Sequence, residues 1–500
     1  MYRRKRTTVA RSRAATPWRV IRRVPAAAWV CTLVAVLNAA SWSFIVPPFQ
    51  VTDEPDHFAY VKQLAETGNG PQLSAPNTYG PEEFYALKAL RYTSIRLRAG
   101  AAAIFSEAEQ HDLEVGLQTH RSPASTTGNA GTATDEPPLY YALESIPYTL
   151  DLSGNLLERL QLMRLLSALL GGLTALFTFL FLREALPGVR WAWTVGTLGV
   201  ALSPMFAMMS GAVNPDAMLF AVSAAIFYCL SRAFRCGLTK GSAIATGASI
   251  AIGFATKLSF LGLAPGAFLA LAILATRGWR TAGRQGLRAP AIAALIAASP
   301  AVAYVAAKVL TSRHPFALAT SAIHDLHGSL LNRANYIWQL YLPRLPGTRN
   351  DFPGLSSTRQ IWFDGYVGKF GWLDTAFPGW VYTTALVVAV AIAGLLLHEL
   401  VASRASLRAR AGELAAYAAI SLGMMALIGL SSYLVYPQKF AEYGQVRYLL
   451  PLLPLLAVIF ALAARGAGRR WGPTAATLIV ILFFAHDLFG QLQTIARFYG

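Results

Sequence analysis

The sequence predicts an all-α polytopic membrane protein, and three observations support this fold class. Of its 500 residues, 55% are hydrophobic and only 14% are charged, whereas about 25% of the residues of a soluble domain are charged. The hydrophobic residues are concentrated in runs of about 20, the length that crosses a bilayer. Nine Lys and Arg and no acid lie within residues 1–25, before the first run. A basic segment in this place indicates a cytoplasmic tail.

The hydrophobic pattern predicts eleven spans. In chain order they are 26–46, 160–182, 191–209, 212–230, 241–255, 258–275, 289–310, 380–400, 413–434, 448–464 and 473–489. Residues 241–275 are divided at Lys257, because 35 residues are too long for one span and short for two. We therefore expect a bundle of about eleven transmembrane helices.

The charges between the spans predict the orientation of the chain. With the N-terminus in the cytoplasm, each inner connector is rich in Lys and Arg, as the positive-inside rule requires. The chain is then a cytoplasmic tail, 1–25, followed by a single membrane domain, 26–500, whose C-terminus is extracytoplasmic. The net charge of +18 lies mostly in the tail and in these connectors. We therefore expect contact with the lipid bilayer and no binding of nucleic acid.

Two large segments, 47–158 and 311–379, are predicted to lie on the outer side. Residues 47–137 of the first contain twelve Asp and Glu but six Lys and Arg, a net charge of −6. Residues 54–66 and 82–97 repeat apolar side chains at helical spacing, which predicts amphipathic helices at the membrane interface. The second segment holds two aromatic runs, which either stack on sugar rings or form an interfacial belt.

Acidic residues are concentrated directly after the first span, where Asp53, Glu54, Asp56 and His57 occupy five positions. Carboxylates at this depth are costly unless water, a cation or a substrate meets them. Asp53 and His57 are four positions apart, so a helix would place them on one face. Asp53 and Glu54 could hold a divalent cation, but these residues do not distinguish Mg²⁺ from Mn²⁺, or either from none. Asp53 could also cap the helix that is entered at Pro55.

Three elements resemble the GT-C superfamily of integral-membrane glycosyltransferases. The first is the acidic pair Asp53 and Glu54 at the start of the first outer segment. The second is EPPLYY, residues 136–141, which resembles the HPPLYY segment of mannosyl- and aminoarabinosyl-transferase relatives. The third is RLLSALLGG, residues 164–172, which is similar to the Arg-x-x-Ser pattern that opens their second span. Glu136 departs from the pattern, because many members have His there.

A more detailed resemblance is to a bacterial membrane family of unassigned function. It is carried by PPFQVTDEPDHF (47–58), GKFGWLDTAFP (368–378) and RYLLPLLPLL (447–456). The superfamily resemblance implies a GT-C-like bundle in the bacterial plasma membrane and a sugar donor linked to polyprenyl phosphate. It also implies inversion at the anomeric carbon and an acceptor outside the cytoplasm, which would be an envelope glycan, lipid or protein.

Glycosyl transfer needs a base for the acceptor hydroxyl and positive charge beside the departing phosphate. The resemblance implies that an acid of the first outer segment is the base. We therefore expect Asp53 to be catalytic, with Glu54 supporting it or helping to hold a cation. The residues that we expect to bind substrate are His57, Glu136, Arg164, Lys257 and Arg447.

Four cations at the outer ends of the spans could surround a lipid phosphate: Arg159, Arg164, Lys257 and Arg447. Each could instead extend to the interface with no ligand, as long basic side chains often do. Arg447 is the favoured phosphate ligand because it lies in a matching motif. Turn chemistry explains residues 214–216, with Asp216 as an acid that could support the site.

Two other functions stay open, a transporter or flippase of lipid-linked sugars and a non-enzymatic membrane protein of envelope assembly. A transporter would more often show internal repeats and ionisable residues near the middle of the bilayer. Here the charged residues of interest lie near the predicted outer surface, which favours chemistry there.

Overall fold

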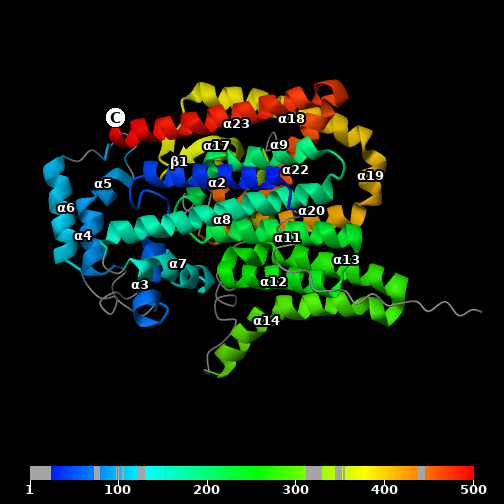
Figure 1. Cartoon of the computed structure of the whole chain (residues 1–500), viewed down its shortest axis with the longest axis horizontal. Helices are drawn as coiled ribbons and strands as arrows, with labels where there is room; N and C mark the ends of the chain where they lie inside the picture. Colours follow the sequence, from blue (N-terminus) through cyan, green and yellow to red (C-terminus); the bar gives the residue numbers. More distant parts are fainter. Residues whose placement is uncertain are drawn as a thin grey trace, which may run out of the picture.

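The computed structural model of the chain describes residues 24–71, 79–96, 98, 101–103, 106–121, 130–151, 154–310, 329–343, 352, 355–435 and 445–500. Long helices run side by side along the molecule, and short helices gather at one end of the bundle (Figure 1). The long helices are α2 (Ala26–Ile45), α8 (Leu156–Ala185), α11 (Asp216–Cys236), α12 (Lys240–Thr256), α13 (Ala264–Ala282), α14 (Arg288–Leu310), α18 (Gly379–Ala402), α20 (Ala411–Val435), α22 (Leu453–Gly466) and α23 (Gly468–Tyr499).

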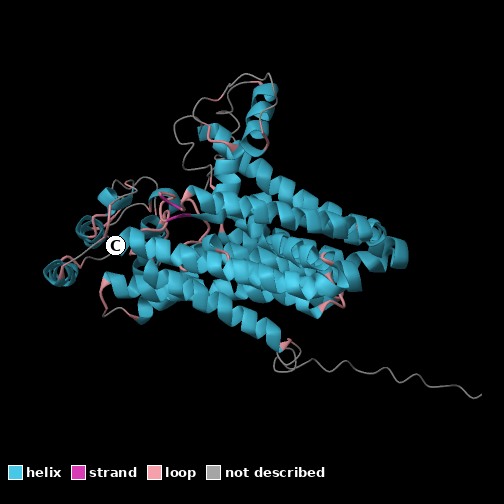
Figure 2. Cartoon of the chain, turned by 90° about the horizontal axis from the view of Figure 1, so that it is seen from above, coloured by secondary structure: helices cyan, strands magenta, loops and turns pink. Residues whose placement is uncertain are grey.

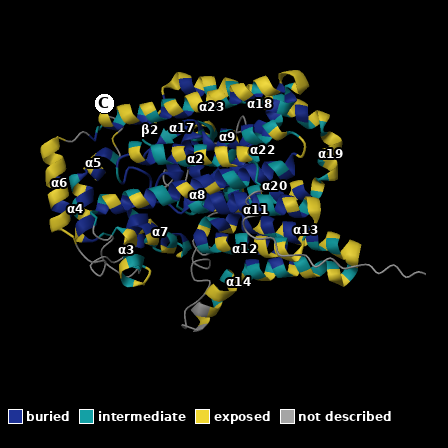
Figure 3. Ribbon diagram, in the orientation of Figure 1, coloured by how far each residue is buried: buried dark blue, intermediate teal, exposed yellow. Residues whose placement is uncertain are grey.

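The most buried helices lie in the middle of the bundle. Figure 3 shows α8 and α11 largely in the colour of buried residues, whereas α18 and α23 expose much of their surface. The exposed side chains of these outer helices are apolar, as Leu397 on α18 and Leu488 on α23 illustrate. A helix that is apolar all round and exposed in the isolated protein is expected to face lipid. The structure is therefore that of an all-α membrane protein.

Each of the eleven predicted spans contains a described helix, but one span is broken. Residues 191–209 form α9 (Arg190–Ala201) and α10 (Pro204–Ser210), which are bent by 65°. Proline at position 204 has no N–H for the helical hydrogen bond and disfavours helix in the residue before it. Among the described residues, eight helices are long and apolar enough to span a membrane, or nine if the bent pair is one span. The count is below eleven because α12 has 17 residues and because 264–306 counts as one apolar stretch.

The described residues of the segment 47–158 form five short helices. They are α3 (Glu54–Thr67), α4 (Pro81–Ala89), α5 (Tyr92–Arg96), α6 (Glu107–Thr119) and α7 (Leu139–Leu150), and the 3₁₀ turn η2 (Gly131–Ala133) precedes α7. The predicted helix 54–66 is confirmed, and α3 buries Phe58 and Val61 inside the protein. The predicted helix 82–97 is divided at Arg91, which has a φ of 53° that a helix cannot contain.

The second outer segment ends in a small hairpin. Its described elements are α16 (Leu330–Tyr341), η5 (Arg359–Phe363), α17 (Asp364–Gly368), β1 (Lys369–Phe370) and β2 (Thr375–Ala376). The strands are antiparallel, with Lys369 opposite Ala376. Figure 2 shows them at the same end of the bundle as the C-terminus. The remaining connectors are η3 (Leu258–Gly262), η4 (Gly283–Leu287), α19 (Arg404–Ala409) and η6 (Val446–Leu452).

Candidate functional site

The turn between α2 and α3 holds two residues in a strained backbone conformation. Phe49 and Asp53 each have a φ of 64°, in the left-handed region that residues with a side chain rarely adopt. Such a conformation costs about 1–3 kcal/mol per residue and persists only where surrounding contacts enforce it. Asp53 directly precedes α3, yet its side chain makes no capping hydrogen bond to that helix. The capping interpretation is therefore wrong, and the carboxylate is directed to another partner.

A buried ion pair fixes this turn. Glu54 is fully buried, and its oxygens accept hydrogen bonds from Arg164 Nε at 2.8 Å and Nη2 at 2.6 Å. The other Arg164 N–H groups donate to three backbone carbonyls at the end of α2, those of Ser43, Val46 and Pro47. Glu54 accepts two further bonds from the backbone N–H groups of Phe49 and Val213. Because every guanidinium N–H is used, this pair supports the turn and has no group left for a ligand.

The Asp53 side chain contacts Arg447, which lies on η6. Asp53 Oδ2 is 2.5 Å from Arg447 Nη2, and the two side chains are 22% and 3% exposed. The carboxylate is therefore the more exposed half of the pair. Arg447 also donates to the Thr52 carbonyl at 3.4 Å and to the Tyr448 hydroxyl at 3.1 Å. Its buried Nε has no acceptor among the described residues, so one donor is unused.

The second cation, Lys257, lies between α12 and η3. Its Nζ is 2.8 Å from Asp216 Oδ1 at the start of α11, and both side chains are buried. The same atom is 6.0 Å from the centre of the Tyr448 ring. The Glu136 carboxylate accepts the N–H of Leu258, the next residue, at 2.8 Å. Lys257 therefore lies within electrostatic range of the carboxylates of Asp216 and Glu136 and of the guanidinium of Arg447.

His57 lies on α3 one turn after Asp53, as the spacing predicts. Its Nδ1 is 2.9 Å from the Tyr141 hydroxyl of the EPPLYY segment. Burial, and then the positive charge of Lys257, lower the pKa of His57 from 6.5 to about 3. The ring is therefore neutral at neutral pH and can accept or donate one hydrogen bond. Burial raises the pKa of Glu136, although Lys257 opposes this change.

Of the seven residues that we expected at the site, Asp53, His57, Lys257 and Arg447 lie within electrostatic range of one another, and Glu136 lies within range of Lys257. They come from the first outer segment, the junction of α12 with η3, and η6. The other two, Glu54 and Arg164, form the saturated pair that supports the turn. The two neighbouring acids therefore differ in their surroundings. The side chain of Asp53 is partly exposed, whereas that of Glu54 is fully buried.

The turn at 213–216 also belongs to the site, although its sequence is explained by turn chemistry alone. Asn214 donates its amide N–H to the Thr52 carbonyl at 3.3 Å, the same carbonyl that Arg447 contacts. Asp216 pairs with Lys257 across 41 positions of sequence. An acid at the predicted outer end of a span is the signal that points to this role.

The segments that carry the family resemblance meet at this turn. The Trp372 indole N–H, from the β1–β2 hairpin, donates to the Phe49 carbonyl at 3.1 Å. The Thr52 hydroxyl donates to the Gly371 carbonyl at 3.2 Å. PPFQVTDEPDHF is thus in contact with GKFGWLDTAFP, and the first residue of RYLLPLLPLL pairs with Asp53. Three motifs that are far apart in the sequence therefore converge on one carboxylate.

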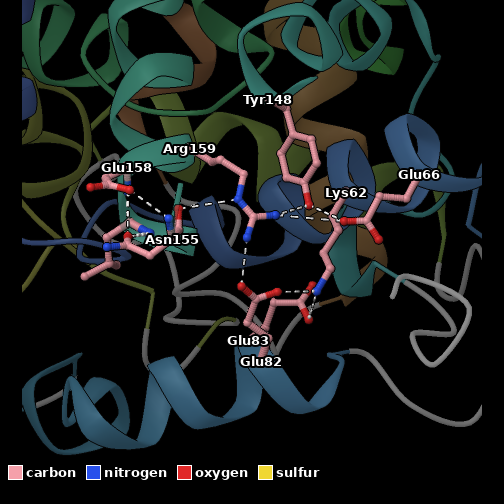
Figure 4. Close-up of polar contacts among 9 residues, drawn as sticks. Lys62, Glu66, Glu82, Glu83, Tyr148, Asn155, Glu158 and Arg159 are labelled. Carbon is pink, nitrogen blue, oxygen red and sulfur yellow. Dashed lines mark hydrogen bonds and ion pairs between the residues drawn. The ribbon is translucent and has the colours of Figure 1, made fainter. Parts of the chain in front are cut away.

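A second buried charge network ties α3 to α4 and α8, and we call it the α4 clamp. Figure 4 shows Lys62 and Arg159 directed at the acids of α4. Lys62 Nζ is 3.0 Å from Glu82 and 3.2 Å from Glu83, and Arg159 Nη2 is 2.9 Å from Glu82. Arg159 also donates to the Tyr148 hydroxyl at 2.6 Å. Arg159 is thus occupied in the clamp and does not join the cations beside Asp53.

The residues at the turn do not fit the divalent cation that we considered. A hard cation needs several oxygen ligands that are free to face it. Glu54 is saturated by Arg164, and Asp53 Oδ2 is paired with the guanidinium of Arg447. Among the described residues, no three His, Cys, Asp or Glu converge in a group that could hold a metal ion. No catalytic step is therefore assigned to a metal.

The sequence profile of one protein family matches this chain. The family is described as "Predicted membrane protein (DUF2142)", and the match covers residues 36–456. No curated protein matches the chain.

The solved structures that match the chain include an ArnT and an oligosaccharyltransferase, both at low sequence identity. ArnT from Cupriavidus metallidurans, bound to undecaprenyl phosphate, is 15% identical over 89% of this chain and 79% of its own, with a TM-score of 0.35. The apo oligosaccharyltransferase from Archaeoglobus fulgidus is 11% identical over 94% of this chain, with a TM-score of 0.44. This chain covers only 56% of that oligosaccharyltransferase. Because both TM-scores are below 0.5, these structures carry no argument about the site. The roles of the site residues are argued from the geometry of this chain alone.

Proposed function

The chain belongs to the DUF2142 family of predicted membrane proteins, and we propose that it is a glycosyltransferase. It moves a sugar from a polyprenyl-phosphate carrier to a hydroxyl of a cell-envelope acceptor, with inversion, at the outer face of the bacterial plasma membrane. The Asp53–Arg447 pair is the observation that carries this proposal. It places a partly exposed carboxylate beside a guanidinium that has an unused N–H.

Asp53 is the general base of the proposed reaction. The acceptor oxygen forms a bond to the anomeric carbon, and the bond from that carbon to the phosphate oxygen breaks with its electron pair. Asp53 takes the proton that the acceptor hydroxyl loses, and the polyprenyl phosphate leaves as an anion. Attack from the face opposite the phosphate inverts the anomeric carbon. A positioned base contributes about 10²–10⁴-fold to such a rate.

Arg447 and Lys257 are the groups that we assign to the phosphate. The unused Nε of Arg447 can donate to one phosphate oxygen, and its planar guanidinium suits two such contacts. Lys257 adds a second positive charge and is oriented by Asp216. His57 and Glu136 lie beside these cations and complete the polar wall that we assign to the sugar.

The shared guanidinium couples donor binding to the strength of the base. Burial by itself would raise the pKa of Asp53, but Arg447 is the main group that holds that pKa below its usual 3.8. A bound phosphate neutralises much of this positive charge. The effect of burial then dominates and raises the pKa of Asp53. The carboxylate becomes a stronger base once the donor is in place.

This coupling predicts two different acid limits for activity. The base must be deprotonated, so activity falls as the pH falls through the pKa of Asp53. In the free enzyme that pKa is lowered, and we expect kcat/KM for the donor to decline only below the ordinary carboxyl range. In the donor complex the pKa is raised, so kcat should decline at a higher pH than kcat/KM does. Measuring both profiles tests this order, and coincident acid limbs would contradict the coupling.

Glycan and lipid-linked-sugar profiling of a deletion strain tests the function itself. We expect one envelope glycan to lose a sugar and the matching polyprenyl-phosphate sugar to accumulate, with both changes reversed by the wild-type gene. A transporter would give the same two changes in the deletion strain. It would, however, retain function without the Asp53 base, so complementation by Asp53→Asn separates the two functions.

A further inference from the structure

A cavity of about 450 Å³ lies beside the turn that carries Asp53. The turn contributes Pro47, Pro48 and Gln50 to its wall. The opposite walls come from α5, α6 and the first turns of α8, and the C-terminal end of α23 closes one side. Figure 1 shows α6 at the end of the bundle, lying across the direction of the long helices. The volume of the cavity is within the range of ligand sites, about 300–1,000 Å³.

The cavity wall combines apolar surface with uncharged and acidic polar groups. Its polar side chains include Gln110 and Glu114 of α6 and Gln161 of α8. None of the described lining residues is a Lys or Arg, although the chain contains 43 of them. An anionic headgroup would therefore find no counter-charge here. Amides and carboxylates instead bind hydroxyl groups, and proline and leucine surfaces suit the C–H faces of a sugar ring.

One wall residue is a glutamine on the turn that carries Asp53. Gln50 is only 2% exposed and lines the cavity. An amide both donates and accepts hydrogen bonds, so it suits the hydroxyl groups of a sugar. Gln50 lies three positions before Asp53, so a ligand that binds this amide is held on the segment that carries the base.

We propose that this cavity binds the acceptor, a neutral, hydroxyl-rich glycan end. The proposal rests on the glycosyltransferase function proposed above. The anionic donor then binds at the two cations and the uncharged acceptor binds in the cavity, and the turn 47–53, which carries the base, borders both. This arrangement explains why an arginine with five hydrogen bonds holds the turn in its strained conformation.

A photo-crosslinker placed on α6 tests the proposal in cells that make the full chain. Gln110 and Val115 are both exposed residues of α6, but only Gln110 lines the cavity. We would replace each in turn with p-benzoylphenylalanine, irradiate the cells, and stain the purified protein with periodate for bound carbohydrate. We expect a carbohydrate-positive adduct from position 110 and none from position 115. An adduct that carries acyl chains or peptide without sugar, or equal labelling at both positions, would overturn the proposal.

The same experiment in the Asp53→Asn background separates this proposal from the function on which it rests. If both hold, transfer is lost while the carbohydrate adduct at position 110 persists, because the acceptor still binds. If transfer is lost but no sugar is captured, the acceptor cavity is wrong and the transferase proposal stands. If transfer continues while sugar is captured, the cavity binds glycan and the assignment of the base is wrong.

Discussion

Replacing Asp53 by asparagine is expected to slow sugar transfer by about 10²–10⁴-fold while the protein stays folded. Asparagine has nearly the same size and its side-chain oxygen can still accept from Arg447, but it cannot take a proton at neutral pH. The side chain is partly exposed and caps no helix, so its removal leaves α3 intact. Complementation of the deletion strain and quantification of the glycan measure the effect, and the amount of membrane-inserted protein reports folding.

Asp56→Asn is the matched control for this variant. Asp56 lies on the same helix, but its carboxylate accepts from the Tyr79 hydroxyl at 2.5 Å and from Thr132, away from the two cations. The same chemical change there should leave transfer close to wild type. If Asp53→Asn supports a normal glycan, or if both variants fail alike, Asp53 is not the base.

Arg164→Ala should cause the largest loss of stability among single changes at the site, about 3–5 kcal/mol in the free energy of unfolding. The substitution leaves the fully buried Glu54 without its counter-charge and removes the partner of three carbonyls at the end of α2. Because those contacts enforce the strained turn, transfer should be lost together with stability. Unfolding of the purified protein in detergent, followed by denaturant or heat, measures this change.

Arg232→Ala provides the comparison for that variant. Arg232 also pairs with a buried glutamate, Glu184, but its own side chain is 48% exposed and Arg235 contacts the same acid. Exposed pairs contribute about 0–1 kcal/mol, so this variant should unfold near the wild-type midpoint. Removing both charges, with Glu54→Gln and Arg164→Met, should recover part of the stability without restoring transfer. An Arg164→Ala protein as stable as wild type would show that the pair does not support the turn.

The arrangement of helices was largely predictable because lipid imposes a simple rule on the sequence. Every span needs a long apolar run, and each predicted run contains a described helix. The bend between α9 and α10 was not predicted, since the proline at 204 lies inside a run that is apolar throughout. Helix 82–97 is divided because Arg91 adopts a positive φ. Hydrophobic spacing carries no information about that change of backbone conformation.

The site was predictable only in part, because spacing cannot show which charges meet. The i, i+4 relation of Asp53 and His57 follows from sequence alone. The division of labour between Asp53 and Glu54 does not, since it depends on Arg164, 110 positions away from Glu54. Asp216 was considered only as a supporting acid, because its pairing with Lys257 joins two different helices. Tertiary contacts of this kind leave no local pattern.

Single-turnover transfer by the purified protein tests the central claim most directly. The protein would be reconstituted in lipid with a labelled polyprenyl-phosphate sugar and an extract of envelope acceptor, and release of polyprenyl phosphate would be followed with time. Wild type should release the carrier and form the inverted product only when acceptor is present, whereas Asp53→Asn should bind the donor and leave it intact. Equal release by the two proteins would contradict the account.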